Sequence, residues 1–215
     1  MTNRIFFAGA HRIGLPKEAR VLAAYDEVSG FPKLERLLEH CDPVSIGEGT
    51  FVGDNCTVYE GTRIGAKCVL EDQTRIGFGC EIGPSSRIMY AAYVCDRVIV
   101  GENCRIAGFV CDAARIGKNC TVMGQLSHKY TVSDLEWGDV DEPSPVIEDD
   151  CIVGLGAEIV GGIVLGSGTF VTGGSLLTKS TPPNSIVTGT NTIVPFNEWK
   201  GDDLRAFFER KTSSG

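Results

Sequence analysis

The chain lacks a long apolar run, a basic cluster and any closely spaced pair of cysteines. No stretch of about 18 apolar residues occurs, so a membrane-spanning helix is not expected. The formal net charge is −8 without a lysine- and arginine-rich segment, which argues against a nucleic-acid partner but leaves room for a local anion pocket. The first ten residues make a poor signal peptide, and nine cysteines without a Cys-x-x-Cys motif favour reduced thiols. A cytoplasmic location is therefore expected.

The sequence has instead a repeat of six residues. From Ile46 to Ile106 an aliphatic residue, which we call the hexad residue, recurs at every sixth position. A glycine often follows it directly, as in Ile46-Gly47 and Ile82-Gly83. Neither the 3.6-residue period of a helix nor the two-residue period of a strand produces this spacing. A fixed repeat of this length is typical of a hexapeptide β-helix, which is a solenoid of stacked coils.

Three hexads are expected to form one triangular coil of about 18 residues, with coils stacked at roughly the 4.8 Å strand spacing. The repeat then predicts two aliphatic ladders, one formed by Ile46, Ile64, Ile82 and Val100 and the other by Val52, Leu70, Ile88 and Ile106. The glycine after the hexad residue is expected to occupy a corner that requires a positive φ.

Six of the nine cysteines share one position in the repeat, four residues after a hexad residue. Other hexads carry threonine, serine or alanine there, so cysteine at this position is predicted to be a small filler that faces the coil interior. A disulfide or zinc framework is the alternative. The six are Cys56, Cys68, Cys80, Cys104, Cys120 and Cys151.

The repeat divides the chain into three parts. Residues 1–45 do not keep the period and are predicted to form a helical cap. One helix is expected from Pro16 to about Val28, and a second short helix begins near Phe31 and is closed by Asp42-Pro43. Residues 46–194 are predicted to form the solenoid, interrupted by an extruded loop at 128–145. Residues 195–215 are expected to form a tail that closes with a short helix. A long loop in a regular solenoid usually has a function, because the repeat does not need it.

These features resemble the hexapeptide-repeat acyltransferases. The resemblance implies an all-β fold, a left-handed parallel β-helix of about seven coils with small helical caps at both ends. The left-handedness comes from the resemblance alone, since the general rule for parallel crossovers predicts the opposite hand. Two segments, 145–154 and 173–187, resemble the coils that follow the loop in the xenobiotic and sugar acetyltransferase branch.

The resemblance also implies where a cofactor would bind. In that branch the final coil lies along the pantetheine arm of coenzyme A, whose amides need exposed backbone groups and small side chains, while a lysine suits the phosphates. The cofactor contacts that it assigns are Leu155, Gly173, Thr178 and Lys179. Asn191-Thr192 stand where Pro-Ala is usual, which leaves open whether this coil retains activity.

His128 is the candidate catalytic base, because the family places a histidine just before the extruded loop. Imidazole suits the removal of a proton from a hydroxyl or ammonium group as it attacks a thioester. The implied activity is direct transfer of an acetyl or longer acyl group from acyl-coenzyme A to a hydroxyl or amine of a small molecule, with a sugar or amino sugar as the first choice. No metal is expected, and the family implies a homotrimer.

Two other functions remain open. The solenoid also occurs as a non-catalytic scaffold or regulatory subunit, which binding of acetyl-coenzyme A would argue against. It also hosts a zinc hydratase that resembles γ-class carbonic anhydrase, but this chemistry needs three converging histidines. The sequence places only His128 in the predicted solenoid, with His11 and His40 in the predicted cap.

Overall fold

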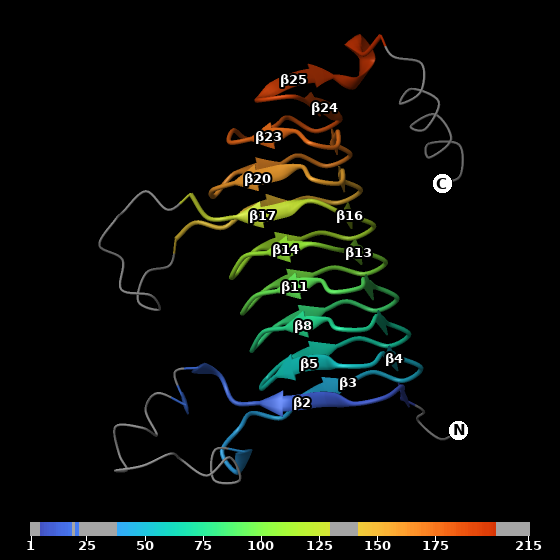
Figure 1. The fold of residues 1–215 in the computed structure, drawn as a ribbon. Helices are drawn as coiled ribbons and strands as arrows, with labels where there is room; N and C mark the ends of the chain where they lie inside the picture. The colour runs from blue at the N-terminus through green and yellow to red at the C-terminus, as the bar shows by residue number, and fades with distance from the viewer. Residues whose placement is uncertain (1–4, 19, 22–37, 130–141, 201–215) are drawn as a thin grey trace.

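The protein is a triangular solenoid whose three faces are parallel β-sheets (Figure 1). The computed structural model describes residues 5–18, 20–21, 38–129 and 142–200. Successive strands contribute in turn to sheets A, B and C, and the chain rises in a left-handed sense, as the family resemblance implied. Within the described ranges no helix is long and apolar enough to cross a membrane.

Sheet A runs the full height of the stack. Its strands, in spatial order, are β1 (Phe6–Phe7), β4 (Phe51–Val52), β7 (Val69–Leu70), β10 (Arg87–Ile88), β13 (Arg105–Ile106), β16 (Thr121–Val122), β19 (Ile152–Val153), β22 (Phe170–Val171), β24 (Ser185–Thr188) and β25 (Thr192–Pro195). Among the described strands only the β24–β25 pair is antiparallel, so the chain turns back at the top of the stack. A short 3-10 helix, η1 (Phe196–Glu198), follows.

Sheets B and C form the other two faces. Sheet B consists of β2 (His11–Leu15), β5 (Cys56–Tyr59), β8 (Arg75–Ile76), β11 (Tyr93–Val94), β14 (Phe109–Val110), β17 (Gln125–Ser127), β20 (Glu158–Val160) and β23 (Leu176–Leu177). Sheet C consists of β3 (Ser45–Ile46), β6 (Arg63–Ile64), β9 (Glu81–Ile82), β12 (Ile99–Val100), β15 (Arg115–Ile116), β18 (Val146–Ile147) and β21 (Val164–Leu165). Sheet C has a strand from each complete coil, which gives the seven coils expected from the sequence.

The hexad residues form the core, as the repeat predicted. Ile46 pairs with Ile64 and Ile64 with Ile82 along sheet C, while Val52 pairs with Leu70 along sheet A. The residue before each hexad residue points outward, because successive side chains on a strand alternate between faces. Leu70 is fully buried, and so are most hexad residues above it. The interior is therefore a continuous stack of aliphatic side chains.

The first coil corrects the predicted boundary at residue 45. Phe7 pairs with Val52 and Ile13 with Val58, so β1 and β2 are the first two sides of the solenoid rather than part of a helical cap. Phe7 and Ile13 are themselves six residues apart, a signal hidden because the chain then leaves the coil. The two predicted N-terminal helices lie mostly outside the described residues, and so do residues 201–215 of the predicted tail. Of the first helix, the structure describes one turn, in which the backbone N–H groups of Arg20 and Val21 donate to the Lys17 carbonyl.

The prediction for the glycine after each hexad residue is wrong. Positive φ occurs two positions later, at residues such as Gly49 and Asn55. The directly following glycine instead faces the next coil at close range. A Cβ on Gly65 would lie 2.6 Å from the backbone nitrogen of Pro84, and one on Gly83 would lie 2.5 Å from the carbonyl carbon of Gly101. Glycine is needed there because the stacked backbones leave no room for a side chain.

The six cysteines at the repeated position are buried, which confirms them as interior fillers; the structure describes all nine cysteines of the chain, and none of them forms a disulfide. The six also occupy a hydrogen-bonding position. The Thr50 hydroxyl donates to the Gly65 carbonyl at 2.9 Å, and one ladder position higher the Cys68 thiol lies 3.3 Å from the Gly83 carbonyl. A small donor at this position satisfies a corner carbonyl that the coil ladder leaves unpaired.

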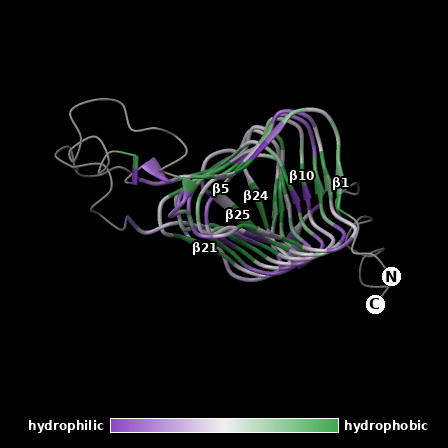
Figure 2. Cartoon of the chain, turned by 90° about the horizontal axis from the view of Figure 1, so that it is seen from below, coloured by the Kyte–Doolittle hydropathy of each residue, from purple (hydrophilic) through white to green (hydrophobic). Residues whose placement is uncertain are grey.

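Two excursions leave the solenoid from the same corner, between sheets B and C. The first leaves after β2 in coil 1 and returns at β3, and the second leaves after β17 in coil 6 and returns at β18. Their described ends lie on one side of the stack when it is viewed along its axis (Figure 2). The corner between sheets A and B is instead shortened in coils 5 and 6, where only residues 107–108 and 123–124 join the strands.

Candidate functional site

His128 lies where the second excursion leaves the B–C corner. It follows β17 directly, two residues after the buried hexad residue Leu126. Its side chain is only 11 % exposed, and its Nδ1 lies 4.0 Å from Oε2 of Glu142. Glu142 belongs to the returning end of the same excursion, and its side chain is 14 % exposed. The two ends of the excursion therefore bring an imidazole and a carboxylate together.

The returning end is held against the solenoid by three contacts. The Ser144 hydroxyl donates to the Asp112 carbonyl at 2.6 Å, and the Arg115 N–H donates to the Pro145 carbonyl at 3.1 Å. Pro143 occupies the space that a side chain on Gly162 would need. Together these contacts hold the backbone on the carboxyl side of Glu142 against the solenoid.

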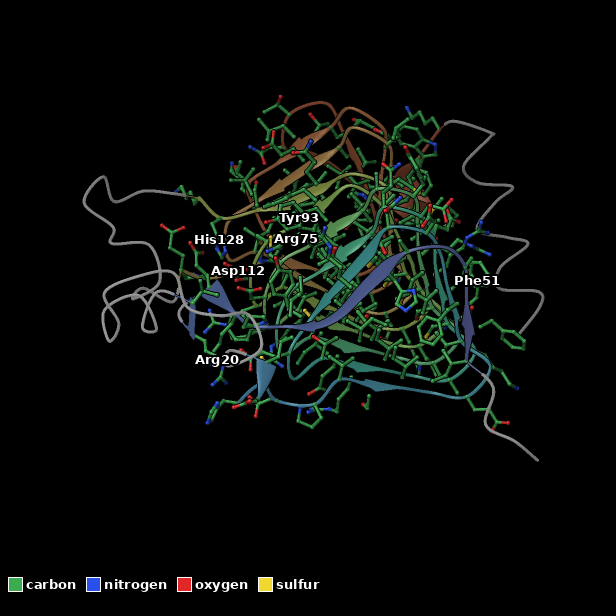
Figure 3. All side chains as sticks on the ribbon, turned by 60° about the horizontal axis from the view of Figure 1, so that its bottom comes forward. Arg20, Phe51, Arg75, Tyr93, Asp112 and His128 are labelled. Carbon is green, nitrogen blue, oxygen red and sulfur yellow. The ribbon has the colours of Figure 1, made fainter. Side chains whose placement is uncertain are left out.

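Acidic side chains lie below His128 along the same corner. Asp112 and Asp96 occupy the position of His128 one and two coils lower, because each is two residues after the hexad residue of its strand. Figure 3 shows Asp112 and His128 close together at this edge. The Asp112 carboxylate accepts the Asp96 N–H at 2.8 Å, and the Asp96 carboxylate accepts the Phe78 N–H at 3.0 Å. Burial raises the pKa of Asp96.

Glu60 occupies the same corner position near the bottom of the stack. It is 1 % exposed and accepts the N–H groups of Lys17 and Asp42 and the guanidinium of Arg20. Burial alone would raise the pKa of Glu60, but the Arg20 and backbone hydrogen bonds outweigh it and lower the pKa to about 2. This carboxylate therefore ties both ends of the first excursion to the corner.

The four predicted cofactor residues fall into two pairs. Leu155 is 75 % exposed at the A–B corner, and Gly173 lies above it, with the Gly174 N–H donating to the Leu155 carbonyl. Thr178 and Lys179 are exposed at the B–C corner after β23, and Lys179 shares the corner position of His128. The two pairs thus lie at opposite edges of sheet B. One chain brings Lys179 to the side of His128 but not Leu155 or Gly173.

Asn191, a departure from the usual motif, bonds to Thr178. Its side-chain oxygen accepts the Thr178 N–H at 2.8 Å, and its side-chain nitrogen donates to the Thr178 hydroxyl at 3.0 Å. The backbone donor expected to meet a pantetheine amide is therefore already engaged in this structure.

The described residues do not fit the zinc site of the hydratase alternative. Among them no group of three histidine, cysteine, aspartate or glutamate side chains converges as metal ligands would. His11 belongs to β2 rather than to a cap, and its ring stacks on Phe7 with centroids 4.5 Å apart. His40 lies in the first excursion, outside the solenoid strands.

A model of the hexapeptide repeat of succinyl-transferase matches residues 43–72 and 146–179, on both sides of the second excursion. Both matched segments carry the six-residue repeat. No protein of curated function matches this chain. The first matched segment contains β3 to β7, and the second contains β18 to β23, from the coil of His128 upward.

Several solved structures resemble this chain at low identity. A putative acetyltransferase from Bacillus cereus is 17 % identical, covers 99 % of this chain and 93 % of its own, and gives a TM-score of 0.35. A UDP-N-acetylglucosamine acyltransferase from Campylobacter jejuni is 16 % identical over 76 % of this chain and 77 % of its own, with a TM-score of 0.41. A Bacillus cereus N-acyltransferase in complex with dTDP and coenzyme A is 14 % identical over 87 % of this chain and all of its own, with a TM-score of 0.37. Identities and TM-scores this low transfer no activity to this chain.

Proposed function

We propose that the protein is an acyltransferase that moves an acyl group directly from a coenzyme A thioester to a hydroxyl or amine of a small acceptor. The acceptor is a sugar or amino sugar, and His128 is the general base. The observation that carries this proposal is the pairing of a largely buried histidine with Glu142 at the root of a long excursion that the solenoid itself does not need.

The pairing gives each imidazole nitrogen a separate task. Nδ1 faces the Glu142 carboxylate, and a small side-chain movement would shorten the 4.0 Å separation between Nδ1 and Oε2 to a hydrogen bond. A carboxylate at Nδ1 favours the tautomer that carries its proton there and stabilises the imidazolium that forms later. In this tautomer Nε2 presents its lone pair to the acceptor.

The chemistry needs no covalent enzyme intermediate. Nε2 takes the proton from the acceptor as its oxygen or nitrogen attacks the thioester carbonyl carbon. When the carbon–sulfur bond breaks, the imidazolium returns that proton to the departing thiolate, so free coenzyme A leaves as a thiol and His128 is again neutral. Glu142 acts by orienting the ring.

The proposed thioester site lies between two chains of a homotrimer. Leu155 and Gly173 at the A–B corner of one chain would contact the pantetheine arm, and His128 at the B–C corner of a neighbour would meet its thioester end. The separation of these residues across sheet B supports a shared site, because one chain does not bring them together. In this arrangement Thr178 reaches the cofactor only by releasing Asn191.

The test replaces His128 with alanine and follows thiol release from acetyl-coenzyme A and longer acyl donors against a panel of amino sugars. General-base catalysis typically contributes about 10²- to 10⁴-fold, so His128→Ala should lower kcat by that range. His11→Ala is the matched control, because His11 stacks on Phe7 at the A–B corner and should leave turnover unchanged. Both variants should keep the wild-type melting temperature within a few degrees.

Two results would overturn the proposal. Near-full turnover by a folded His128→Ala protein would remove the assigned base. Failure of the wild-type protein to bind any acyl-coenzyme A by calorimetry would favour a non-catalytic scaffold instead.

A further inference from the structure

The outer face of sheet B carries an aromatic and cationic stack that the proposed chemistry leaves without a role. The residue before each hexad residue points outward there, and the register aligns Arg75, Tyr93 and Phe109 on three successive strands. Tyr59 projects from the strand below. These four residues, which we call the aromatic shelf, lie below the edge that carries His128; Figure 3 shows Arg75 and Tyr93 beside Asp112 and His128.

The two tyrosines cover both faces of the Arg75 guanidinium. Its Cζ lies 4.6 Å from the ring centroid of Tyr59 and 4.4 Å from that of Tyr93. Phe109 supports the upper tyrosine edge-on, with centroids 5.5 Å apart and an interplanar angle of 89°. A guanidinium held between two rings keeps its N–H groups around the rim of its plane. The shelf therefore presents a rigid set of donors on a partly exposed surface.

Two outward arginines near Arg75 form ion pairs. Arg63 pairs with Glu81 on sheet C, and Arg87 pairs with Glu71 beside sheet A. Among the described residues no such pair joins Arg75 to a carboxylate. The nearby Asp96 carboxylate accepts the Phe78 N–H and acts on Arg75 through its charge without forming an ion pair, while the Tyr59 side chain is hydrogen-bonded to the Arg75 guanidinium. A stacked arginine whose rim lacks a carboxylate is suited to bind a planar or tetrahedral anion with two parallel N–H bonds.

The shelf lies at a defined distance from the proposed base. Arg75 is on β8, three strands below β17, and three strand spacings amount to about 14 Å along the stack. His128 directly follows β17 on the same side of the molecule. One sugar ring does not span this distance. An acceptor that reaches both residues must be extended and must carry its anionic group away from the acylated hydroxyl or amine.

We infer that the aromatic shelf binds the anionic group of the acyl acceptor, a phosphate or a carboxylate, through the rim of Arg75. This inference rests on the acyltransferase function proposed above and narrows its acceptor to an extended anionic sugar derivative. Tyr59 and Tyr93 hold the guanidinium in place, so the anion meets a positioned donor pair instead of a flexible side chain. The sheet spacing then directs the other end of the acceptor toward His128.

The first test measures acceptor preference. Amino sugars extended by a phosphate, by a carboxylate and by a neutral hydroxyl group of similar length are compared as acceptors at fixed acetyl-coenzyme A. Arg75→Gln should lower kcat/KM by about 10- to 100-fold for the anionic acceptors, the range of a lost charged hydrogen-bond pair, and leave the neutral one unchanged. Arg75→Lys should recover part of the loss, because it restores the charge but not the fork. The phosphate and carboxylate arms identify which anion the shelf prefers.

Arg105→Gln is the matched control, since Arg105 is an exposed arginine on sheet A that should change neither preference nor rate. Equal loss for charged and neutral acceptors would overturn the inference, and so would no loss at all. A change of oligomeric state in Arg75→Gln without a change in anion preference would also overturn it, because a second copy would then cover the shelf.

Failure of the acyltransferase function has a different signature. Then the wild-type protein binds no acyl-coenzyme A and acylates nothing, and titration with inorganic pyrophosphate, followed by calorimetry, tests the shelf directly. Binding that Arg75→Gln abolishes would keep the anion site while refuting its role in an acceptor. If pyrophosphate does not bind, both the anion site and its role in acceptor binding are refuted.

Discussion

Two kinds of glycine in the repeat should respond differently to the same substitution. Gly83 follows a hexad residue and lies against the next coil, whereas Gly79 has a positive φ of 62° and open space around it. A Cβ on Gly83 would lie 2.5 to 2.6 Å from the backbone of Gly101 and Glu102. A Cβ on Gly79 would meet nothing closer than the Arg97 Cγ at 3.8 Å.

The cost of Gly83→Ala follows from this geometry. Ordinary carbon contacts begin at about 3.5 Å, so the two coils must separate locally by roughly an ångström. The Gly83 N–H now donates to the Val100 carbonyl at 2.7 Å, and such a separation would take it out of hydrogen-bond range. Overpacking of about 1–3 kcal/mol and a lost buried hydrogen bond of about 1–3 kcal/mol together predict roughly 2–6 kcal/mol.

Gly79→Ala should cost only about 1–2 kcal/mol, the penalty of a left-handed backbone conformation for alanine. Urea unfolding monitored by far-ultraviolet circular dichroism measures both free energies of unfolding, and melting temperatures should fall by about 2–4 °C per kcal/mol. Equal losses for the two variants, or a larger loss for Gly79→Ala, would refute the idea that contact between coils is what requires glycine after the hexad residue.

The remaining predictions concern the Glu60 carboxylate and the cysteine thiols. Glu60 has its pKa lowered to about 2 in the folded state from an ordinary value of 4.5, so its contribution to stability is present above about pH 4.5 and is lost as the pH falls toward 2. Glu60→Gln should therefore lose up to about 3 kcal/mol at pH 7 and show a shallower loss of stability with acid in urea titrations; an unchanged acid slope would contradict this. The native protein should expose at most Cys41 and Cys95 to a bulky thiol reagent, because the other seven cysteines are buried, and all nine should react in denaturant. Rapid labelling of Cys104 in the folded state, mapped by mass spectrometry, would count against the filler assignment.

The sequence predicts the faces of this fold better than its corners. Hexad spacing identifies the core, since one inward aliphatic side chain per six residues is a requirement that every coil repeats. It misjudges the glycines, because a close approach between coils is a property of two segments about 18 residues apart and not of one turn. It also misses β1 and β2, whose single six-residue interval from Phe7 to Ile13 is too short to recognise beside a long excursion.

Around His128, too, the sequence predicts the neighbours that belong to the repeat and misses those that do not. Asp112 could have been found by counting, because it is two residues after its hexad residue, as His128 is. The approach of Glu142 could not, since it depends on the return path of a non-repetitive segment and on the Ser144 contact that fixes it. The shelf arginine precedes a hexad residue, so its outward direction is predictable, but its place between Tyr59 and Tyr93 requires the register of three strands.

Because the two excursions leave from the same corner, the number of coils between them sets the distance between their exit points. The chain leaves the B–C corner in coil 1 and again in coil 6, so the two exit points are five coil spacings apart, or about 24 Å. Because every coil returns to the same corner, this separation changes only in whole steps of about 4.8 Å and without rotation when a coil is gained or lost. In evolution, gain or loss of one coil can therefore change the distance between the two excursions by one coil spacing, while the residues that attach each excursion to the solenoid stay the same.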